Sequence, residues 1–475
     1  MPNAMTELAT EASTLGEGST SASLTSDIGR FLSEISYEDL PPEALPLVRD
    51  SFADTVGVIM VGLDQPASEI VRKVLVEPAG SAEARACLSS RRVGAPDAAL
   101  LAGAIAHSLD YDDQSMSGHP GAVLVPAILA EAEALGSTGK EMVTAWVAGY
   151  EVWCELWRRG RNYHEKGWHP TSVFGAMAAA SAGAVLHGLT AERAATAVAI
   201  AGSYAGGLFS NFGSMMKGYH AGLAARGGLE AARLAAAGMS AGPDAIENVQ
   251  GFLMAFSSNG KPDLTSESNL GREWYLPRHK LLIKLHPTCY FLHRSFNATV
   301  QMLAGRAVAP DDVESVEVRM GRGQVTCLVY ERPQTRWEAE FSGQYGIAAA
   351  VLLGKMGVPE LADEVVTRED LQAFYPKVKL IPVDEFDPRD PVFSPTESVT
   401  MTLLSGEVIE SGPVATIPGH AETPLSAEQL WGKFRECTTN THTEEEAREL
   451  FELLHSIDTL TSTGELPTCN ALFKD

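Results

Sequence analysis

The stretch GWHPTSVFGAMAAASAGAVLHGL, residues 167–189, joins an aromatic loop that carries a histidine to a long run of alanine and glycine. The run is apolar enough to suggest a membrane span, but it contains small residues rather than leucine and isoleucine, and His187 interrupts it. Small side chains let helices approach closely, so the run predicts a buried central helix that leaves room for a cavity. We expect the loop to direct His169 into that cavity, with Trp168 as one wall.

Helical patterns surround this stretch and favour a mainly α fold. Thr138 and Glu141 have capping-box spacing at the start of a segment whose apolar residues recur at helical intervals. Another helix is predicted between Pro120 and Gly136, because proline is common in the first helical turn and glycine just beyond the last. We therefore assign residues 27–277 to a large all-α helical domain.

The pattern changes after about residue 277. Val316, Val318 and Met320 alternate with polar residues, as in a half-buried strand. Residues 398–413 alternate in the same way and contain a Ser-Gly turn signal. One apolar helix pattern lies between these two segments. Residues 278–416 are therefore predicted to form a smaller α+β lid domain.

The C-terminal residues 417–475 are helical in pattern again. Ser426 and Gln429 have capping-box spacing at the start of this segment. We expect these helices to return to the helical domain. A division into a large and a small domain suits a chain of 475 residues, which is too long for one ordinary core.

The composition of the chain limits the kinds of molecule that it is expected to bind. The net charge of −25 argues against nucleic acid and against anionic membranes, although a local basic pocket can still bind a small anionic substrate. The six cysteines show no CxxC spacing, so neither a zinc ribbon nor a disulfide framework is predicted, and reduced thiols favour a cytoplasmic location. Residues 1–26 are rich in Ser, Thr, Gly and Glu and lack the features of a signal peptide, so we interpret them as a disordered tail.

Four segments concentrate polar side chains among apolar ones, at residues 107–120, 162–172, 211–222 and 284–295. Taken singly, their histidines and acids are explained as satisfied core residues, solvated turns or helix caps. Taken together they point to a site, because a lysine such as Lys217 is costly to bury on an apolar helical face unless an anion meets it. A metal site at Asp112, Asp113 and His119 is a weaker alternative, since the chain lacks HExxH and the other common ligand spacings.

These segments together resemble the MmgE/PrpD family, which includes 2-methylcitrate dehydratase, cis-aconitate decarboxylase and iminodisuccinate epimerase. LDYDDQSMSGHP is similar to the family's D-[FY]-D-D-[TS]…HP motif, and GWHPTS is similar to its [FW]-H-P-[TS] motif. FGSMMKGYHAGLAA, KLHPTCYFLH and EAEFSGQYGIAAAVLL resemble three further motifs. The five motifs follow the family's order, and the resemblance covers roughly residues 27–420.

The resemblance implies an active site between the helical domain and the lid. The catalytic side chains that it implies are Asp110, His119, His169 and Lys217, with Tyr345 from the lid. The same segments supply the candidate substrate-binding residues Trp168, His220, Lys284, His286 and Cys289. The resemblance also implies a homodimer that needs neither a metal nor an organic cofactor. Gln114, Gly218 and His286 depart from the family's usual residues, and these departures leave the identity of the substrate open.

The implied chemistry is the loss of a proton or of CO2 from a carbon next to a carboxylate. Lys217 would stabilise the negative charge that develops, and His169 or His119 would transfer the proton. Asp110 would orient a histidine or act as a base, and Tyr345 would protonate a leaving group when the lid closes.

We therefore expect a lyase that acts on a small di- or tricarboxylate and resembles 2-methylcitrate dehydratase. Epimerisation of iminodisuccinate and decarboxylation of cis-aconitate are alternatives that use the same kind of pocket. A non-catalytic helical binding protein is the alternative from another functional class.

Overall fold

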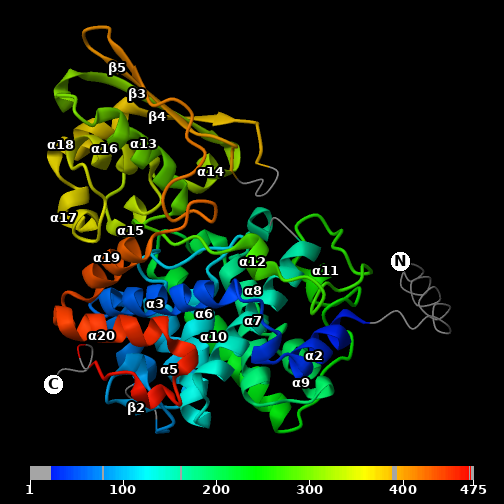
Figure 1. Cartoon of the computed structure of the whole chain (residues 1–475). Helices are drawn as coiled ribbons and strands as arrows, with labels where there is room; N and C mark the ends of the chain where they lie inside the picture. The colour runs from blue at the N-terminus through cyan, green and yellow to red at the C-terminus, as the bar shows by residue number, and fades with distance from the viewer. Residues whose placement is uncertain (1–22, 77–79, 161–162, 388–392, 470, 472–475) are drawn as a thin grey trace, which may run out of the picture.

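The computed structural model describes residues 23–76, 80–160, 163–387, 393–469 and 471. Helices dominate it, which confirms the prediction of a mainly α protein. Figure 1 shows a large helical part and, above it, a smaller part that contains the main sheet. The helices of the large part are α2 (Leu24–Glu34), α3 (Ala44–Gly62), α4 (Pro66–Val71), α5 (Ala95–Ala106), α6 (Pro120–Leu135), α7 (Gly139–Arg159), α8 (Pro170–Leu186), α9 (Ala191–Ala201), α10 (Met215–Ala236), α11 (Phe252–Phe256), α12 (Tyr275–His279), α19 (Ala427–Thr438) and α20 (Glu444–His455).

The start of the helical part differs from the prediction. The predicted tail, residues 1–26, lies outside the described residues as far as residue 22, but α2 already begins at Leu24. Leu24, Ile28 and Phe31 are buried on one face of α2, and the helix packs against α9. The boundary was placed too late because the polar residues before Leu24 masked the first turn of an amphipathic helix.

Helix α8 is the central helix that the small-residue run predicts. Its residues from Pro170 to Ala184 are buried, and it packs against α10, α7 and α6. The flanking helices also begin and end as expected, because the Thr138–Glu141 capping box starts α7 and Gly136, in the left-handed region, ends α6. Within the described ranges, no helix combines the length and the apolar character needed to cross a bilayer.

Two glycines set the separation between α10 and α5. A Cβ at Gly222 would lie 2.2 Å from the carbonyl oxygen of Leu100, and a Cβ at Gly218 would lie 3.0 Å from Ser108 Cα. Only residues without a Cβ allow this approach without displacing backbone. The close contact brings Lys217, in the first turn of α10, to the loop that follows α5.

The region assigned to an all-α domain contains one small sheet, which the helical patterns did not predict. Strands β1 (Ala84–Arg85) and β2 (Arg92–Val93) pair antiparallel. Two residues a strand are too few to produce a recognisable alternation in sequence.

The smaller part is built on a four-stranded sheet with the order β4-β3-β5-β6. Its strands are β3 (Val313–Gly321), β4 (Val378–Val383), β5 (Ser398–Leu403) and β6 (Val408–Glu410). β3 pairs parallel with β4 and antiparallel with β5, and the predicted Ser-Gly turn joins β5 to β6. The predicted inward residues Val316, Val318 and Met320 are all buried. They form a second hydrophobic core, separate from that of the helical part.

Helices cover this sheet and fill the second core. α13 packs against α16 and β5, and α16 also packs against β4. The helices of this part are α13 (His293–Leu303), α14 (Arg322–Cys327), α15 (Arg336–Ala339), α16 (Gly343–Leu352), α17 (Asp363–Val366) and α18 (Glu369–Phe374). The chain then leaves the sheet, and α19 and α20 pack against α3 of the helical part (Figure 1).

Candidate active site

The loop between α5 and α6 carries the acidic cluster in a strained backbone. Three of its non-glycine residues have positive φ, namely Asp110 (47°), Met116 (45°) and Ser117 (63°). Such conformations are uncommon for residues with a Cβ and cost roughly 1 kcal/mol or more each, so surrounding contacts must hold them. One such contact is a two-way backbone bridge between Gln114 and Leu282. Strain of this kind gathers at functional sites, and here it aims Asp110 into the interior.

Asp110 is held between two lysines. Lys217 Nζ donates a hydrogen bond to Asp110 Oδ1 at 2.7 Å, and Lys284 Nζ lies 2.9 Å from the same oxygen. Lys284 also donates to the backbone carbonyl of Asp110 at 2.8 Å. All three residues are at most 5% exposed. Two buried ammonium groups face one carboxylate, so the trio carries one positive charge in excess and favours an anion.

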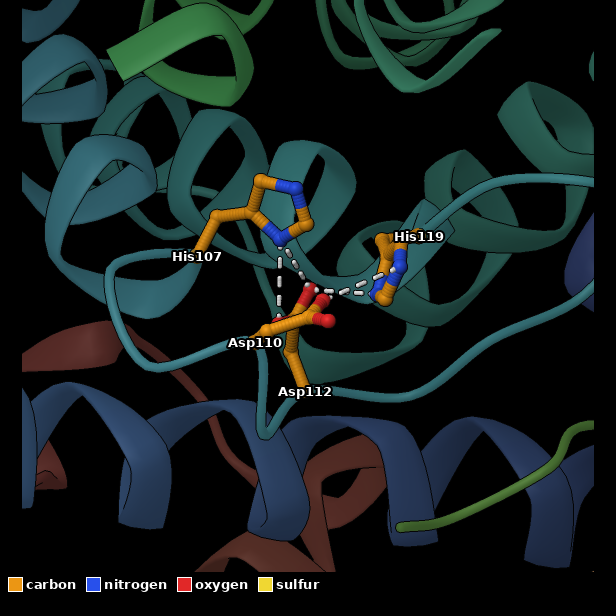
Figure 2. A group of neighbouring side chains, drawn as sticks. All are labelled: His107, Asp110, Asp112 and His119. Atoms are coloured by element: carbon orange, nitrogen blue, oxygen red, sulfur yellow. Dashed lines mark hydrogen bonds and ion pairs between the residues drawn. The ribbon is translucent and has the colours of Figure 1, made fainter. Parts of the chain in front are cut away.

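His107 connects this trio to a second acid. Lys217 Nζ donates to His107 Nε2 at 3.1 Å, and His107 Nδ1 donates to Asp112 Oδ2 at 2.9 Å. His119 Nδ1 lies 3.0 Å from the same Asp112 oxygen, and its Nε2 lies 3.5 Å from Asp110 Oδ1. Figure 2 shows the two imidazoles on either side of the two carboxylates. Asp112 therefore orients both histidines.

His169 lies at the N-terminus of α8 and faces a third histidine. Its Nδ1 is 3.1 Å from Nδ1 of His220, one turn beyond Lys217 on α10. The ring of His169 stacks on His107, with centroids 5.4 Å apart, and meets the edge of Phe212. One of the two facing Nδ1 atoms must carry a hydrogen, which ties the tautomer of His169 to that of His220.

Several of these side chains line a cavity of about 460 Å³ at the junction of the helical and sheet-containing parts. Its polar lining includes Asp110, His119, His169, Lys217, Lys284 and Cys289. Its aromatic lining includes Phe209, Phe212, Tyr290 and Phe341. Lys217 Nζ lies 5.4 Å from the ring centroid of Phe212 and 5.6 Å from that of Phe341. An enclosure of this kind strengthens the interaction of the ammonium groups with an anionic ligand.

Burial and local charge set the protonation of the cavity side chains. Burial opposes ionisation of Asp110, but Lys217 and Lys284 outweigh it and hold the pKa of that carboxyl well below its usual value. Burial lowers the pKa of His169 well below 6.5, and neighbouring positive groups add to the effect. Burial also raises the pKa of the Cys289 thiol to about 12. The cavity thus presents an ionised acid, a neutral imidazole and an intact thiol.

A metal ion fits this cluster poorly. His107, Asp110, Asp112 and His119 offer ligand atoms within 4.8 Å of one another, a spacing that would suit a cation. However, Lys217 and Lys284 already satisfy Asp110 Oδ1, and Lys217 Nζ also approaches His107 Nε2. A divalent cation would be repelled by both ammonium groups and would displace their hydrogen bonds.

Three of the predicted site residues lie away from the cavity. The Tyr345 hydroxyl donates to the carbonyl of Glu360 at 2.8 Å inside the second core, away from the cavity where we expected it. His286 Nδ1 lies 3.2 Å from the carbonyl of Met356. Trp168 packs on Phe256 instead of forming a cavity wall. These three belong to the motif segments, but their side chains point out of the site.

His220 supports His169 from behind, as described above, and does not itself line the cavity. His107 was not predicted as a site residue, because a histidine at the end of an apolar helix is usually a satisfied core residue. The only feature of the sequence that pointed to His107 as a site residue was its position five residues before Asp112. Arg336 was also missed: it donates to the carbonyl of Ser108 at 3.0 Å and pairs with Glu340, which joins the sheet-containing part to the strained loop.

Comparison with known proteins agrees with this arrangement. Residues 26–265 match the MmgE/PrpD N-terminal domain, and residues 286–459 match the MmgE/PrpD C-terminal domain. The cis-aconitate decarboxylase of Homo sapiens is 28% identical over 401 residues, which cover 80% of this chain and 82% of that protein. The cis-aconitate decarboxylase of Aspergillus terreus is 26% identical over 472 residues, which cover 93% and 95%. The chain therefore belongs to the MmgE/PrpD family of enzymes.

Proposed function

We propose that this enzyme acts on a small di- or tricarboxylate by removing a group next to a carboxylate, without a metal ion. The observation that supports this most strongly is the buried trio in which Lys217 and Lys284 share Asp110 at the cavity. The trio combines fixed positive charge with low exposure. A carboxylate that enters the cavity completes the charge balance of the two ammonium groups.

The lysines act on the charge that develops during the reaction. When a proton or CO2 leaves the adjacent carbon, the electron pair moves into the bound carboxylate, which becomes more negative. Lys217 and Lys284 are already oriented by Asp110, so they stabilise this state without reorganisation. Their effect is larger on the reacting state than on the bound substrate, which is the condition for catalysis.

His169 is our candidate for the proton acceptor. It must be neutral to accept a proton, and burial lowers its pKa well below 6.5. If its Nδ1 hydrogen is donated to His220, its Nε2 keeps a lone pair for the substrate. Nε2 makes no hydrogen bond with any of the described residues, so that lone pair is available.

His119 is our candidate for the proton donor. Its Nδ1 lies beside Asp112, and its Nε2 lies near Asp110 at the cavity. In a dehydration, His169 takes the proton from carbon, and His119 donates one to the leaving hydroxyl, so that water is released. For this step His119 must enter as the imidazolium, which burial opposes and the carboxylates of Asp112 and Asp110 favour. This pairing favours a dehydratase that acts on 2-methylcitrate or a similar hydroxy acid.

Decarboxylation of cis-aconitate is the second candidate, and it is the activity for which the two relatives are named. In that reaction the carbon–carboxylate bond breaks, CO2 leaves, and the electron pair passes to the neighbouring carboxylate held by the lysines. A protonated group then delivers a proton to carbon. The same residues serve both reactions, and the choice depends on which bond the cavity aligns.

Proton NMR in D2O with 2-methylcitrate, cis-aconitate and iminodisuccinate tests the proposal. We expect one acid either to lose water, or to lose CO2 with solvent deuterium entering the carbon that the CO2 leaves. Deuterium exchange with epimerisation alone would identify an isomerase instead. If none of the acids reacts or exchanges deuterium, while the protein is folded by circular dichroism, the proposal is wrong.

A further inference from the structure

A second cavity adjoins the first. It measures about 1380 Å³, and Gln114, Ser117 and Tyr290 line both cavities. Two of these three belong to the strained loop, and Ser117 is one of its positive-φ residues. The two cavities are therefore neighbours that share one wall.

The shared wall contains a position where this chain departs from its family. Gln114 stands where the resembled motif has threonine or serine. The backbone bridge to Leu282 fixes the position of the Gln114 Cα, and the residue lines both cavities. An amide at this position offers a donor and an acceptor to a ligand that passes from one cavity to the other.

The larger cavity is lined by two buried donors whose hydrogen bonding is incomplete. Arg294 is 2% exposed and Tyr290 is 3% exposed, and the two side chains interact with each other, but Arg294 Nε and the Tyr290 hydroxyl make no well-formed hydrogen bond among the described residues. Both residues line this cavity. Leaving such groups unpaired when buried costs roughly 1–3 kcal/mol each, so a ligand that pairs them gains that energy.

The positive charge of Arg294 is only partly compensated. Its Nη1 donates to the carbonyl of Ser394 at 3.1 Å, and its guanidinium lies 5.0 Å from the ring centroid of Phe393. The carboxylate of Glu397 lies 3.9 Å away, beyond hydrogen-bond distance, and accepts a hydrogen bond from Gln324 instead. The remaining guanidinium N–H groups are suited to a carboxylate.

The rest of the larger cavity is mixed in character. Asp387 and Glu422 line it, but both already have interaction partners. Trp157, Met116 and Phe393 contribute apolar surface to the lining, and Arg278 contributes a second cation. This lining favours a ligand with an apolar stem and a terminal acid.

We propose that the substrate spans both cavities, with its reacting carboxylate at Lys217 and Lys284 and a second acidic group at Arg294 and Tyr290. The ligand class is an elongated dicarboxylic or tricarboxylic acid whose terminal acid is separated from the reacting end by an apolar stem. This inference rests on the proposed function, because it takes the lysine trio as the site for the first carboxylate.

Binding of linear dicarboxylic acids to the full chain tests the inference. Succinate, adipate and suberate are titrated calorimetrically, with octanoate as the monoacid of the same length as suberate. We expect the affinity to rise about tenfold or more from succinate to the diacid that reaches Arg294. Octanoate should lack the part of this gain that depends on Arg294.

Two sets of variants locate the second acid. Arg294→Gln removes the guanidinium, and we expect the affinity gain of the long diacid to be lost. Arg294→Lys keeps a cation and should retain part of the gain. Because Arg294 is buried, Ala421→Asp provides a second test at a half-buried loop residue of the larger cavity, with Ala421→Asn as its neutral control. The aspartate should lower the binding affinity of the long diacid by about tenfold through charge repulsion, and the asparagine should leave that affinity unchanged.

The possible results separate this inference from the proposed function. If succinate binds but length brings no gain, or if the gain survives in Arg294→Gln and Ala421→Asp, the second acid site is wrong and the lysine site stands. If Ala421→Asp weakens all diacids equally, the larger cavity is only an entrance, which also overturns the inference. If no acid of any length binds, both proposals are wrong.

Discussion

Lys217 Nζ and His107 Nε2 lie 3.1 Å apart, although the two residues come from different helices and are separated by 110 positions. The bond leaves His107 with its Nδ1 hydrogen directed at Asp112. Burial lowers the pKa of His107 to about 3, so this imidazole is neutral and accepts from the ammonium group. His107 is therefore a positioning residue, which holds Lys217 without lining the cavity itself.

Substitution of His107 tests this positioning role. In His107→Gln, the longer side-chain amide can still accept a hydrogen bond from Lys217. In His107→Asn, the shorter amide can donate to Asp112 but does not reach Lys217. We expect kcat to fall about tenfold or more in the asparagine variant and less in the glutamine variant, with smaller changes in KM. Steady-state kinetics on the substrate found by NMR measures both. Equal losses in the two variants, matched by equal losses of Tm, would indicate a purely structural role.

Replacement of the candidate catalytic groups should abolish most of the turnover. We expect His169→Ala and Lys217→Ala each to lower kcat by about 10² or more, because each removes a group that acts on the reacting atoms. Tyr345→Phe is the matched control: it loses only the hydrogen bond to Glu360, so activity should persist while stability drops by about 1 kcal/mol. Near-full activity in either alanine variant contradicts the role assigned to that residue.

The pH dependence of kcat/KM reports the protonation of His169 in the free enzyme. Because burial lowers the pKa of His169 well below 6.5, the imidazole stays neutral as the pH falls through 6.5. We expect the acidic limb of the kcat/KM profile, which reports this base, to lie well below pH 6.5. An acidic limb centred at or above pH 6.5 would be inconsistent with a buried neutral base.

The same lowered pKa predicts the sign of the change in stability. In the unfolded chain His169 takes up a proton near pH 6.5, while in the folded protein it does not, so the free energy of unfolding decreases as the pH falls below 6.5. A His169→Gln variant lacks this group and should lose less Tm between pH 7 and pH 5 than the wild type. Thermal unfolding followed by circular dichroism at each pH provides the comparison.

The contact between α10 and α5 should tolerate no side chain at Gly222. A Cβ there would lie 2.2 Å from the Leu100 carbonyl oxygen, so Gly222→Ala must push the helices apart. We expect a loss of about 1–3 kcal/mol in stability and a fall in kcat, because Lys217 moves with α10. Gly432→Ala in α19 is the control, since no atom lies within 4 Å of its added Cβ and alanine favours helix. If Gly222→Ala matches this control in Tm and kcat, the close packing does not position Lys217.

Removal of metal ions should leave the enzyme active. The two ammonium groups at Asp110 disfavour a divalent cation in the cluster of Figure 2. We expect kcat/KM to be unchanged after dialysis against a chelator, with no gain on addition of Mg²⁺, Mn²⁺ or Zn²⁺. Loss of activity that a single one of these ions restores would show that the cluster binds a metal.

Local patterns predicted the elements of the fold because each depends on near neighbours in sequence. The capping box at Thr138 and the alternation at Val316 hold whatever the rest of the chain does. The same patterns missed β1 and β2, which are too short to show a period, and the first turn of α2, which follows a polar segment.

The motif segments also indicated where the site would form, since Asp110, His119, His169, Lys217, Lys284 and Cys289 all line the cavity. They did not show which way each side chain points, and for this reason Tyr345 was assigned to the site although it lies in the second core. His107 was overlooked because the sequence did not show that its side chain points toward Lys217 and Asp112. Orientation depends on the contacts that a helix makes along its full length, which a motif of a few residues does not contain.

By itself, then, the sequence determined the helical character, the small-residue core and the polar residues available for chemistry. Tertiary structure alone decided that Lys217 meets His107 and Asp110, because that contact requires α10 to approach α5 across Gly218 and Gly222, whose packing partners the motif does not show. It also decided the protonation of these groups, since a pKa depends on burial and on charges brought together by folding from distant parts of the chain.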